Sequence, residues 1–142
     1  MAVLPYALIL LAGLDPCRTA VARLILDHMR AHPDCESAQI LTVLPAVEIV
    51  ESFHVNPDVS GWIHEGRIFI NSNKKCKWTD RKIALFLIHE LVHACGLCLN
   101  DSIRSYGRPI CTIFGRPVYH SMDLTESIKK HFKERRPGNV NR

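Results

Sequence analysis

The sequence lacks the features that mark membrane proteins and nucleic-acid-binding proteins. It contains no apolar run long enough to span a bilayer, no internal repeat and no low-complexity segment. It also has no stripe of basic residues interleaved with aromatic residues, and its net charge of +4 and pI of 8.8 are modest. The sequence therefore favours neither a membrane nor a nucleic acid as a partner.

A convincing signal peptide is also missing. Residues 1–14 are apolar, but no lysine or arginine precedes the apolar core and no clean small-residue cleavage site follows it. We instead expect a buried strand at residues 6–12, followed by a turn, Asp15 as a helix N-cap and Pro16 at the first helical position. This interpretation favours a cytoplasmic location over a secreted one.

The chain does contain enough apolar residues for one domain. Its 142 residues are 47% hydrophobic and 23% charged, and the mean hydropathy is close to zero at +0.02. These values predict a single globular domain over residues 1–136, a disordered tail at residues 137–142 and a monomer.

Six cysteines are many for a cytoplasmic domain. A bond between Cys17 and Cys35 would have to bridge a helix about 24 Å long, whereas bonded cysteines need Cα atoms within about 7 Å. Cys95 and Cys98 form a CxxC pair that fits a redox pair, half of a second zinc site, or apolar filling with an incidental bond. We favour the last of these, because no second CxxC exists and the C-terminal end of a helix raises the pKa of a thiol.

Hydrophobic periodicity predicts a mixture of helices and strands. The expected helices cover residues 16–32, residues 79–97, and a last stretch that contains Leu124, Ile128 and Phe132 and is capped by Asp123 or Thr125. The expected strands cover residues 38–44, residues 46–53, where a short helix fits nearly as well, and residues 62–71, an edge strand bent at Gly66. Residues 97–117 are expected to form loops. This order predicts an α/β (α+β) domain, with a small mixed, twisted sheet backed by two helices and a C-terminal helix.

The strongest chemical signal is an HExxH motif at His89, Glu90 and His93. At 3.6 residues per turn the two histidines lie one turn apart on the same helix face, so both imidazoles can reach one Zn²⁺ at about 2.0–2.1 Å. Glu90 is rotated by roughly 100° from His89 and is placed to take a proton from a water that the metal activates. With eight histidines in 142 residues, random placement predicts only ~0.02 such motifs.

The residues around the motif favour one buried helix. Thr79 is a suitable N-cap, Asp80 complements the positive N-terminal end of the helix, and Gly96 is placed to let the chain turn away at the other end. Apolar residues on nearly every side predict a central position, where the polar HE..H side chains would be costly without a metal.

Through Gly96 the motif matches HExxHxxG, and on these residues the chain resembles the zincin metallopeptidases, most closely a small metzincin. The family pattern continues to a third histidine and a Met-turn, and Met122 lies where a compact Met-turn would fall. The resemblance implies a zincin-like fold, one catalytic Zn²⁺, and a peptide or protein substrate extended along an edge strand at residues 68–71.

The chain departs from the family at the third ligand, because Leu99 stands where the third histidine would. Asp101 is our first choice, since two extra residues after Gly96 could bring a carboxylate under the metal and some small family members use Asp. The alternatives are His120, Cys98, Glu126 and a site without a third protein ligand.

We therefore expect a zinc-dependent metalloendopeptidase in which His89, His93 and Asp101 bind zinc and Glu90 is the general base. The alternative is a catalytically inactive, zinc-stabilised binding module derived from a metallopeptidase, which Leu99 and the short chain would favour. A third hypothesis is a thiol–disulfide protein that uses Cys95 and Cys98.

Overall fold

The computed structural model describes residues 15–75 and 79–133. Its elements follow in the order α2 (Pro16–Met29), α3 (Cys35–Val43), β1 (Ile49–Ser52), β2 (Gly61–His64), β3 (Arg67–Asn71), α4 (Ser72–Lys75), α5 (Asp80–Ala94), β4 (Cys111–Ile113), β5 (Arg116–Val118) and α6 (Ser121–His131). The fold is a mixed arrangement of helices and small sheets, which agrees with the expected class. The strand expected at residues 6–12 and the tail expected at residues 137–142 lie outside the described residues. Within the described ranges, no helix is both long and apolar enough to cross a membrane.

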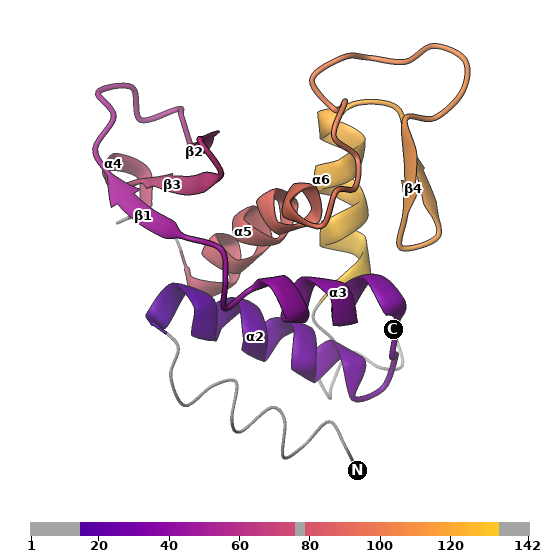
Figure 1. The fold of residues 1–142 in the computed structure, drawn as a ribbon, viewed down its shortest axis with the longest axis horizontal. Coiled ribbons are helices and arrows are strands. Elements are labelled where there is room, and N and C mark those ends of the chain that lie inside the picture. The colour runs from indigo at the N-terminus through magenta and orange to yellow at the C-terminus, as the bar shows by residue number, and fades with distance from the viewer. Residues whose placement is uncertain (1–14, 76–78, 134–142) are drawn as a thin grey trace.

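Helix α5 is the centre of the described fold. Figure 1 shows it between the three-stranded sheet and α6, with α2 and α3 running along one side. Its N-cap is Thr79, as expected, whose hydroxyl accepts the Lys82 N–H at 3.2 Å, while the side chain of Asp80 lies outside the described residues. The buried residues of α5 are Ile83, Ala84, Leu87, Ile88, Leu91 and Val92. Each large apolar side chain buried in this way contributes about 1.5–3 kcal/mol, so α5 is a firm support for the polar residues it carries.

The C-terminal end of α5 is closed by Gly96, as the sequence predicts. Gly96 has φ +81°, and its N–H donates to the His93 carbonyl at 2.9 Å, while the Leu97 N–H donates to the Val92 carbonyl at 3.1 Å. These two bonds form the Schellman arrangement, which requires a residue in the left-handed region. The chain therefore turns away from the helix at Gly96, three residues after the second histidine of the motif.

Strand β3 is the central strand of the three-stranded sheet. It pairs in parallel with β1 and antiparallel with β2, in the order β1-β3-β2. The expected single edge strand over residues 62–71 is wrong, because Glu65 and Gly66 have φ of 50° and 77° and make a two-residue turn between β2 and β3. A peptide cannot add along residues 68–71, where both edges are paired. The strand expected at residues 46–53 is confirmed as β1.

The strand expected at residues 38–44 is wrong, because this segment lies in α3. Asp34 caps the helix by accepting the Ser37 N–H at 2.7 Å and the Ser37 hydroxyl at 2.8 Å. Ile40, Leu41 and Leu44 then bury one helical face in the core. Capping and burial outweigh the strand propensity of this segment.

Two expectations about the C-terminal half also need correction. Residues 97–117 are not all loop, because β4 and β5 form a hairpin whose turn is Phe114 at φ 52° and Gly115 at φ 75°. The last helix is capped by His120 rather than by Asp123 or Thr125. An imidazole nitrogen can accept a backbone N–H as a carboxylate or hydroxyl does, but histidine is not among the residues that usually signal a cap.

We expect Gly61→Ala to destabilise the β2–β3 hairpin. A Cβ at Gly61 would overlap the Phe69 carbonyl oxygen and the ring of Phe86 on α5, so the strand or the helix would have to shift. The free energy of unfolding should fall by about 1–3 kcal/mol in urea denaturation. Gly107→Ala is the matched control, because a Cβ there meets nothing within 4 Å. Equal stability of the two variants would contradict this packing.

Candidate metal centre

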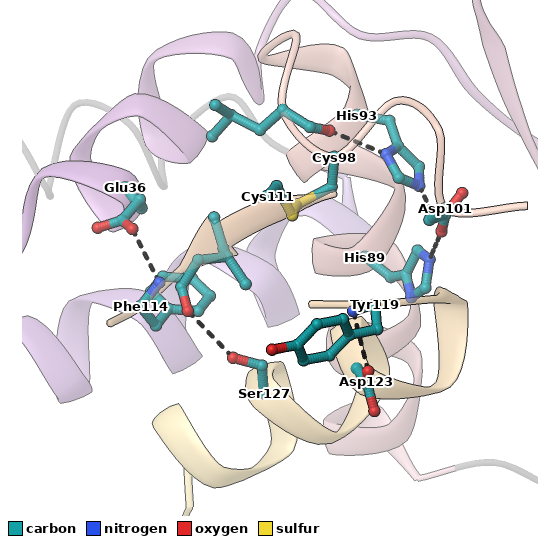
Figure 2. The surroundings of a disulfide bond; sticks show 12 residues. Glu36, His89, His93, Cys98, Asp101, Cys111, Phe114, Tyr119, Asp123 and Ser127 are labelled. Atoms are coloured by element: carbon teal, nitrogen blue, oxygen red, sulfur yellow. Dashed lines mark hydrogen bonds and ion pairs between the residues drawn. A yellow bond between two sulfur atoms is a disulfide. The ribbon is translucent and has the colours of Figure 1, made fainter. Parts of the chain in front are cut away.

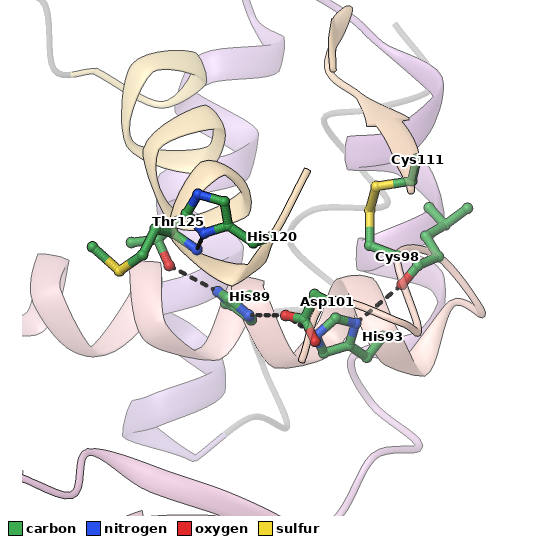
Figure 3. A network of polar contacts seen from close by, with 9 residues as sticks. His89, His93, Cys98, Asp101, Cys111, His120 and Thr125 are labelled. Atoms are coloured by element: carbon green, nitrogen blue, oxygen red, sulfur yellow. Dashed lines mark hydrogen bonds and ion pairs between the residues drawn. A yellow bond between two sulfur atoms is a disulfide. The ribbon is translucent and has the colours of Figure 1, made fainter. Parts of the chain in front are cut away.

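Two histidines of α5 and one aspartate from the following loop converge on a single point. The Nε2 atoms of His89 and His93 lie 3.0 Å and 3.1 Å from Oδ2 of Asp101. Figure 3 shows both rings directed at this carboxylate. The side chains are only 13–15% exposed, so the group is sheltered but open to solvent on one side. The structure thus brings together the three residues that the sequence predicts as metal ligands.

The chain after α5 is tied down on both sides of Asp101. Cys98 forms a disulfide with Cys111 of β4, 13 residues further along. The Ser121 N–H, at the start of α6, donates to the Asp101 carbonyl at 3.0 Å. Figure 2 shows the disulfide beside the contact between His93 and Asp101. The carboxylate is therefore positioned by α5, β4 and α6 together.

Hydrogen bonds on the far side of each ring fix the two imidazoles. Nδ1 of His93 lies 3.0 Å from the Leu97 carbonyl oxygen, which can only accept, so this nitrogen carries a proton. Nδ1 of His89 lies 3.1 Å from the hydroxyl of Thr125 on α6. Partners of this kind set the tautomer and orientation of histidines that bind metals. The sequence does not reveal them, because a backbone carbonyl leaves no signal and Thr125 looks only like a helix cap.

The contact between His93 and Asp101 requires a cation. With its proton on Nδ1, a neutral His93 directs the lone pair of Nε2 at Asp101 Oδ2, and two acceptors 3.1 Å apart repel each other. Either a proton or a metal ion must lie between them. Protonating His89 as well is unfavourable: burial lowers the pKa of His89, and the hydrogen bond to Asp101 and the charge of Asp101 do not overcome burial and the neighbouring His93. One divalent ion could bind both Nε2 atoms and the carboxylate oxygen at once.

The donor set fits a divalent transition metal. Zn²⁺ binds imidazole and carboxylate at about 2.0–2.2 Å in a tetrahedron, which places ligand atoms about 3.3–3.5 Å apart. The contacts of 3.0 Å and 3.1 Å would need to open by only a few tenths of an ångström. The three residues could therefore hold a metal ion.

Glu90 adds a titratable group beside this cluster. It is half-buried on α5 and interacts electrostatically with His93 and Asp101. Burial raises the pKa of Glu90; His93 opposes this shift and Asp101 adds to it. A carboxyl group whose pKa is raised towards neutrality is suited to accepting and returning a proton.

A pocket of about 220 Å³ opens beside His89. Its wall includes the apolar side chains of Leu85 and Phe86 on α5, and the exposed Lys82 and Lys129 also line it. Ser60, which immediately precedes β2, lines the same pocket. Strand β2, one of the two outer strands of the sheet, therefore begins beside this pocket.

The other candidate ligands are engaged elsewhere. Cys98 is in a disulfide and cannot supply a thiolate. His120 caps α6 through Nδ1, and its Nε2 lies 2.7 Å from a guanidinium nitrogen of Arg104. Glu126 is exposed on α6 and lies outside the cluster. Of the alternatives considered, only Asp101 faces both histidines.

The expected Met-turn is wrong, and the weaker hypothesis of a Cys95–Cys98 redox pair is excluded. Met122 lies in the first turn of α6 and is 65% exposed, so it does not form a Met-turn beneath the site. Cys98 pairs with Cys111 and not with Cys95, so the CxxC is not a redox pair. Burial raises the pKa of the Cys95 thiol, which makes it a poor nucleophile.

Comparison with protein-family models, with curated proteins and with solved structures gives no match to this chain.

We expect Thr125→Val to weaken zinc binding by about 10- to 100-fold, because it removes the hydroxyl partner of His89 Nδ1 while preserving side-chain shape. Competition with a chromogenic chelator measures the affinity. Thr42→Val is the matched control, since Thr42 is exposed on α3 and its hydroxyl donates to the Ala38 carbonyl of the same helix at 2.9 Å. Unchanged affinity in Thr125→Val would show that this hydrogen bond does not orient the ligand.

Removing the disulfide should weaken both the fold and the metal centre. The Cys98→Ala/Cys111→Ala double variant opens a closed loop that contains Asp101, with an expected loss of about 2–4 kcal/mol in the free energy of unfolding. Zinc affinity should fall as well, because Asp101 is no longer held from both sides. Cys35→Ala, at an exposed position, is the control. Full zinc affinity in the double variant would mean that the disulfide does not position Asp101.

Proposed function

We propose that this chain is a zinc-dependent metalloendopeptidase with a zincin-like site, and that His89, His93 and Asp101 hold the ion. The observation that carries the proposal is the convergence of two Nε2 atoms on one Asp101 oxygen, with the opposite nitrogen of His93 fixed as a donor. Three protein ligands leave one position of a tetrahedral zinc ion for exchange, which is the arrangement of catalytic rather than structural sites.

Each residue of the site has a distinct role in this proposal. A bound zinc ion would make a water molecule more acidic and would polarise the carbonyl of the scissile bond. Glu90 accepts the proton of the attacking water and returns it to the leaving amine, and its raised pKa suits both steps. The Thr125 hydroxyl and the Leu97 carbonyl hold the rings of His89 and His93 in the orientation in which they would bind the ion.

The substrate is expected to lie beside β2 rather than beside β3. Strand β2 (Gly61–His64) is at an edge of the sheet, and Ser60, which leads directly into it, lines the pocket. An extended peptide there would form main-chain hydrogen bonds with the edge strand and place one side chain in the pocket beside His89. Apolar walls with Lys82 and Lys129 favour a side chain with an apolar stem and a neutral or acidic end.

We expect Glu90→Gln to retain zinc and to lower the cleavage of a denatured protein substrate by about 10²- to 10⁴-fold, because the amide cannot act as a base. Metal content by elemental analysis and cleavage followed by mass spectrometry provide the two readouts. Glu126→Gln, an exposed change on α6, is the control and should retain both zinc and activity.

The outcomes separate the two interpretations of the site. If the Glu90→Gln variant cleaves the substrate as fast as the wild type does, Glu90 is not the general base. Stoichiometric zinc without any cleavage by the wild type would instead support a zinc-stabilised binding module.

A further inference from the structure

A second cluster of metal-binding side chains lies at the other end of α6. His28 comes from α2, Asp34 is the N-cap of α3, and His131 is the last residue of α6. Each offers one ligand atom, and these atoms lie within 4.8 Å of one another. Nε2 of His131 is 2.9 Å from Oδ2 of Asp34, and the rings of His28 and His131 are 4.3 Å apart between centroids.

The carboxylate of Asp34 is held in place by hydrogen bonds. The Ser37 N–H donates to Oδ1 at 2.7 Å, and the Ser37 hydroxyl donates to Oδ2 at 2.8 Å. Ser37 itself is fully buried. Outer hydrogen bonds of this kind orient carboxylates that bind metals. As at Asp101, a histidine Nε2 lies about one hydrogen-bond length from a carboxylate oxygen, here His131 and Asp34 Oδ2 at 2.9 Å.

The ring of His131 is fixed by aromatic neighbours. It stacks on Phe114 with centroids 3.9 Å apart and planes 10° apart, and it meets Phe132 edge-on at 4.7 Å and 85°. A ring held on both sides loses little conformational freedom when it binds an ion. The donor is therefore preorganised.

Solvent reaches the cluster through a surface pocket of about 650 Å³ that both His28 and His131 line. The same pocket is bordered by four permanent cations: Arg30, Arg81, Lys130 and Lys133. Among the described residues, Asp27 is the only carboxylate that lines it; Asp27 is exposed and lies 3.4 Å from Arg30. In the part of the chain that the structure describes, no buried acid lies beside this pocket as Glu90 lies beside the first cluster, so we assign the second cluster no catalytic step.

We propose that His28, Asp34 and His131 bind a second divalent transition-metal ion whose role is structural. Two imidazoles and one carboxylate suit Zn²⁺ and its neighbours in the first transition row. The surrounding cations make this site weaker than the one at Asp101, since they repel a divalent ion. By joining α2, α3 and α6, the ion would clamp three segments that are far apart in the sequence.

Zinc titration in the absence of any substrate tests the second site independently of hydrolysis. With Zn²⁺ as the probe, we expect two ions per wild-type chain, one in Asp101→Ala, one in His131→Gln, and none in the double variant. Glutamine at position 131 can still donate to Asp34, so the α3 cap is preserved, and circular dichroism verifies the fold. His28→Gln should behave like His131→Gln, whereas His32→Gln, an exposed neighbour of His28, should still bind two ions.

Thermal denaturation gives the second readout. Added zinc should raise the Tm of Asp101→Ala, and this rise should disappear when His131→Gln is introduced into the same chain. The proposal is overturned if Asp101→Ala binds no zinc, if its zinc survives both His28→Gln and His131→Gln, or if inorganic phosphate but not zinc raises its Tm, which would identify an anion site. A wild type whose single zinc ion is lost in His131→Gln but kept in Asp101→Ala would support the second site while refuting the proposed catalytic one.

Discussion

Two imidazole nitrogens and one carboxylate oxygen meet at one point in this fold, and either a proton or a metal ion must lie between His93 and Asp101. The Nε2 atoms of His89 and His93 face Asp101 Oδ2 at 3.0 Å and 3.1 Å, and the Leu97 carbonyl keeps the His93 proton on the opposite nitrogen. Holding the lone pairs of His93 Nε2 and Asp101 Oδ2 together in a sheltered site, with neither a proton nor a metal ion between them, would cost several kcal/mol, by the usual penalty for unpaired buried polar groups. The disulfide at Cys98, the Thr125 hydroxyl and the Leu97 carbonyl hold the three side chains in this arrangement.

The scaffold depends on helices more than on its sheets. Helix α5 is buried against α2 and α6, whereas the sheets have only three and two short strands. The three-stranded sheet meets α5 where Phe86 lies against Gly61, and this contact sets the start of β2 beside the pocket next to His89. The two-stranded sheet has a different task, because its Cys111 anchors the loop that carries Asp101. Small sheets are sufficient for both tasks, because one sheet positions the start of β2 and the other positions the loop that carries Asp101.

Local signals in the sequence account for what could be predicted. Thr79, the HExxH spacing and Gly96 lie within one segment, so the ends of α5 and the pair of histidines follow from neighbouring residues alone. Asp101 could be named because the loop from Gly96 is short enough to limit the choice. The segment at residues 38–44 was harder, because its β-favouring residues conflict with the Asp34 cap, and only burial of Ile40 and Leu44 decides between helix and strand. The group of His28, Asp34 and His131 has no signature at all, since His131 and Asp34 are 97 positions apart and meet only after α6 packs.

Helix α6 contacts both clusters, through Thr125 at the first and His131 at the second. Thr125 and His131 are six residues apart, which corresponds to about 9 Å along the axis and roughly 240° around it, so the helix presents different faces to the two groups. The Thr125 hydroxyl is 3.1 Å from Nδ1 of His89, and the hydrogen bond is lost once this distance reaches about 3.6 Å. A small translation or rotation of α6 is therefore enough to release the His89 ring. An ion bound at His131 would resist both movements, because it fixes the end of the helix to α2 and α3. Because α6 is rigid, an ion bound at His131 would then also stabilise the orientation of His89 at the other cluster. This link would depend on the position of the helix and not on the electrostatic field of either ion.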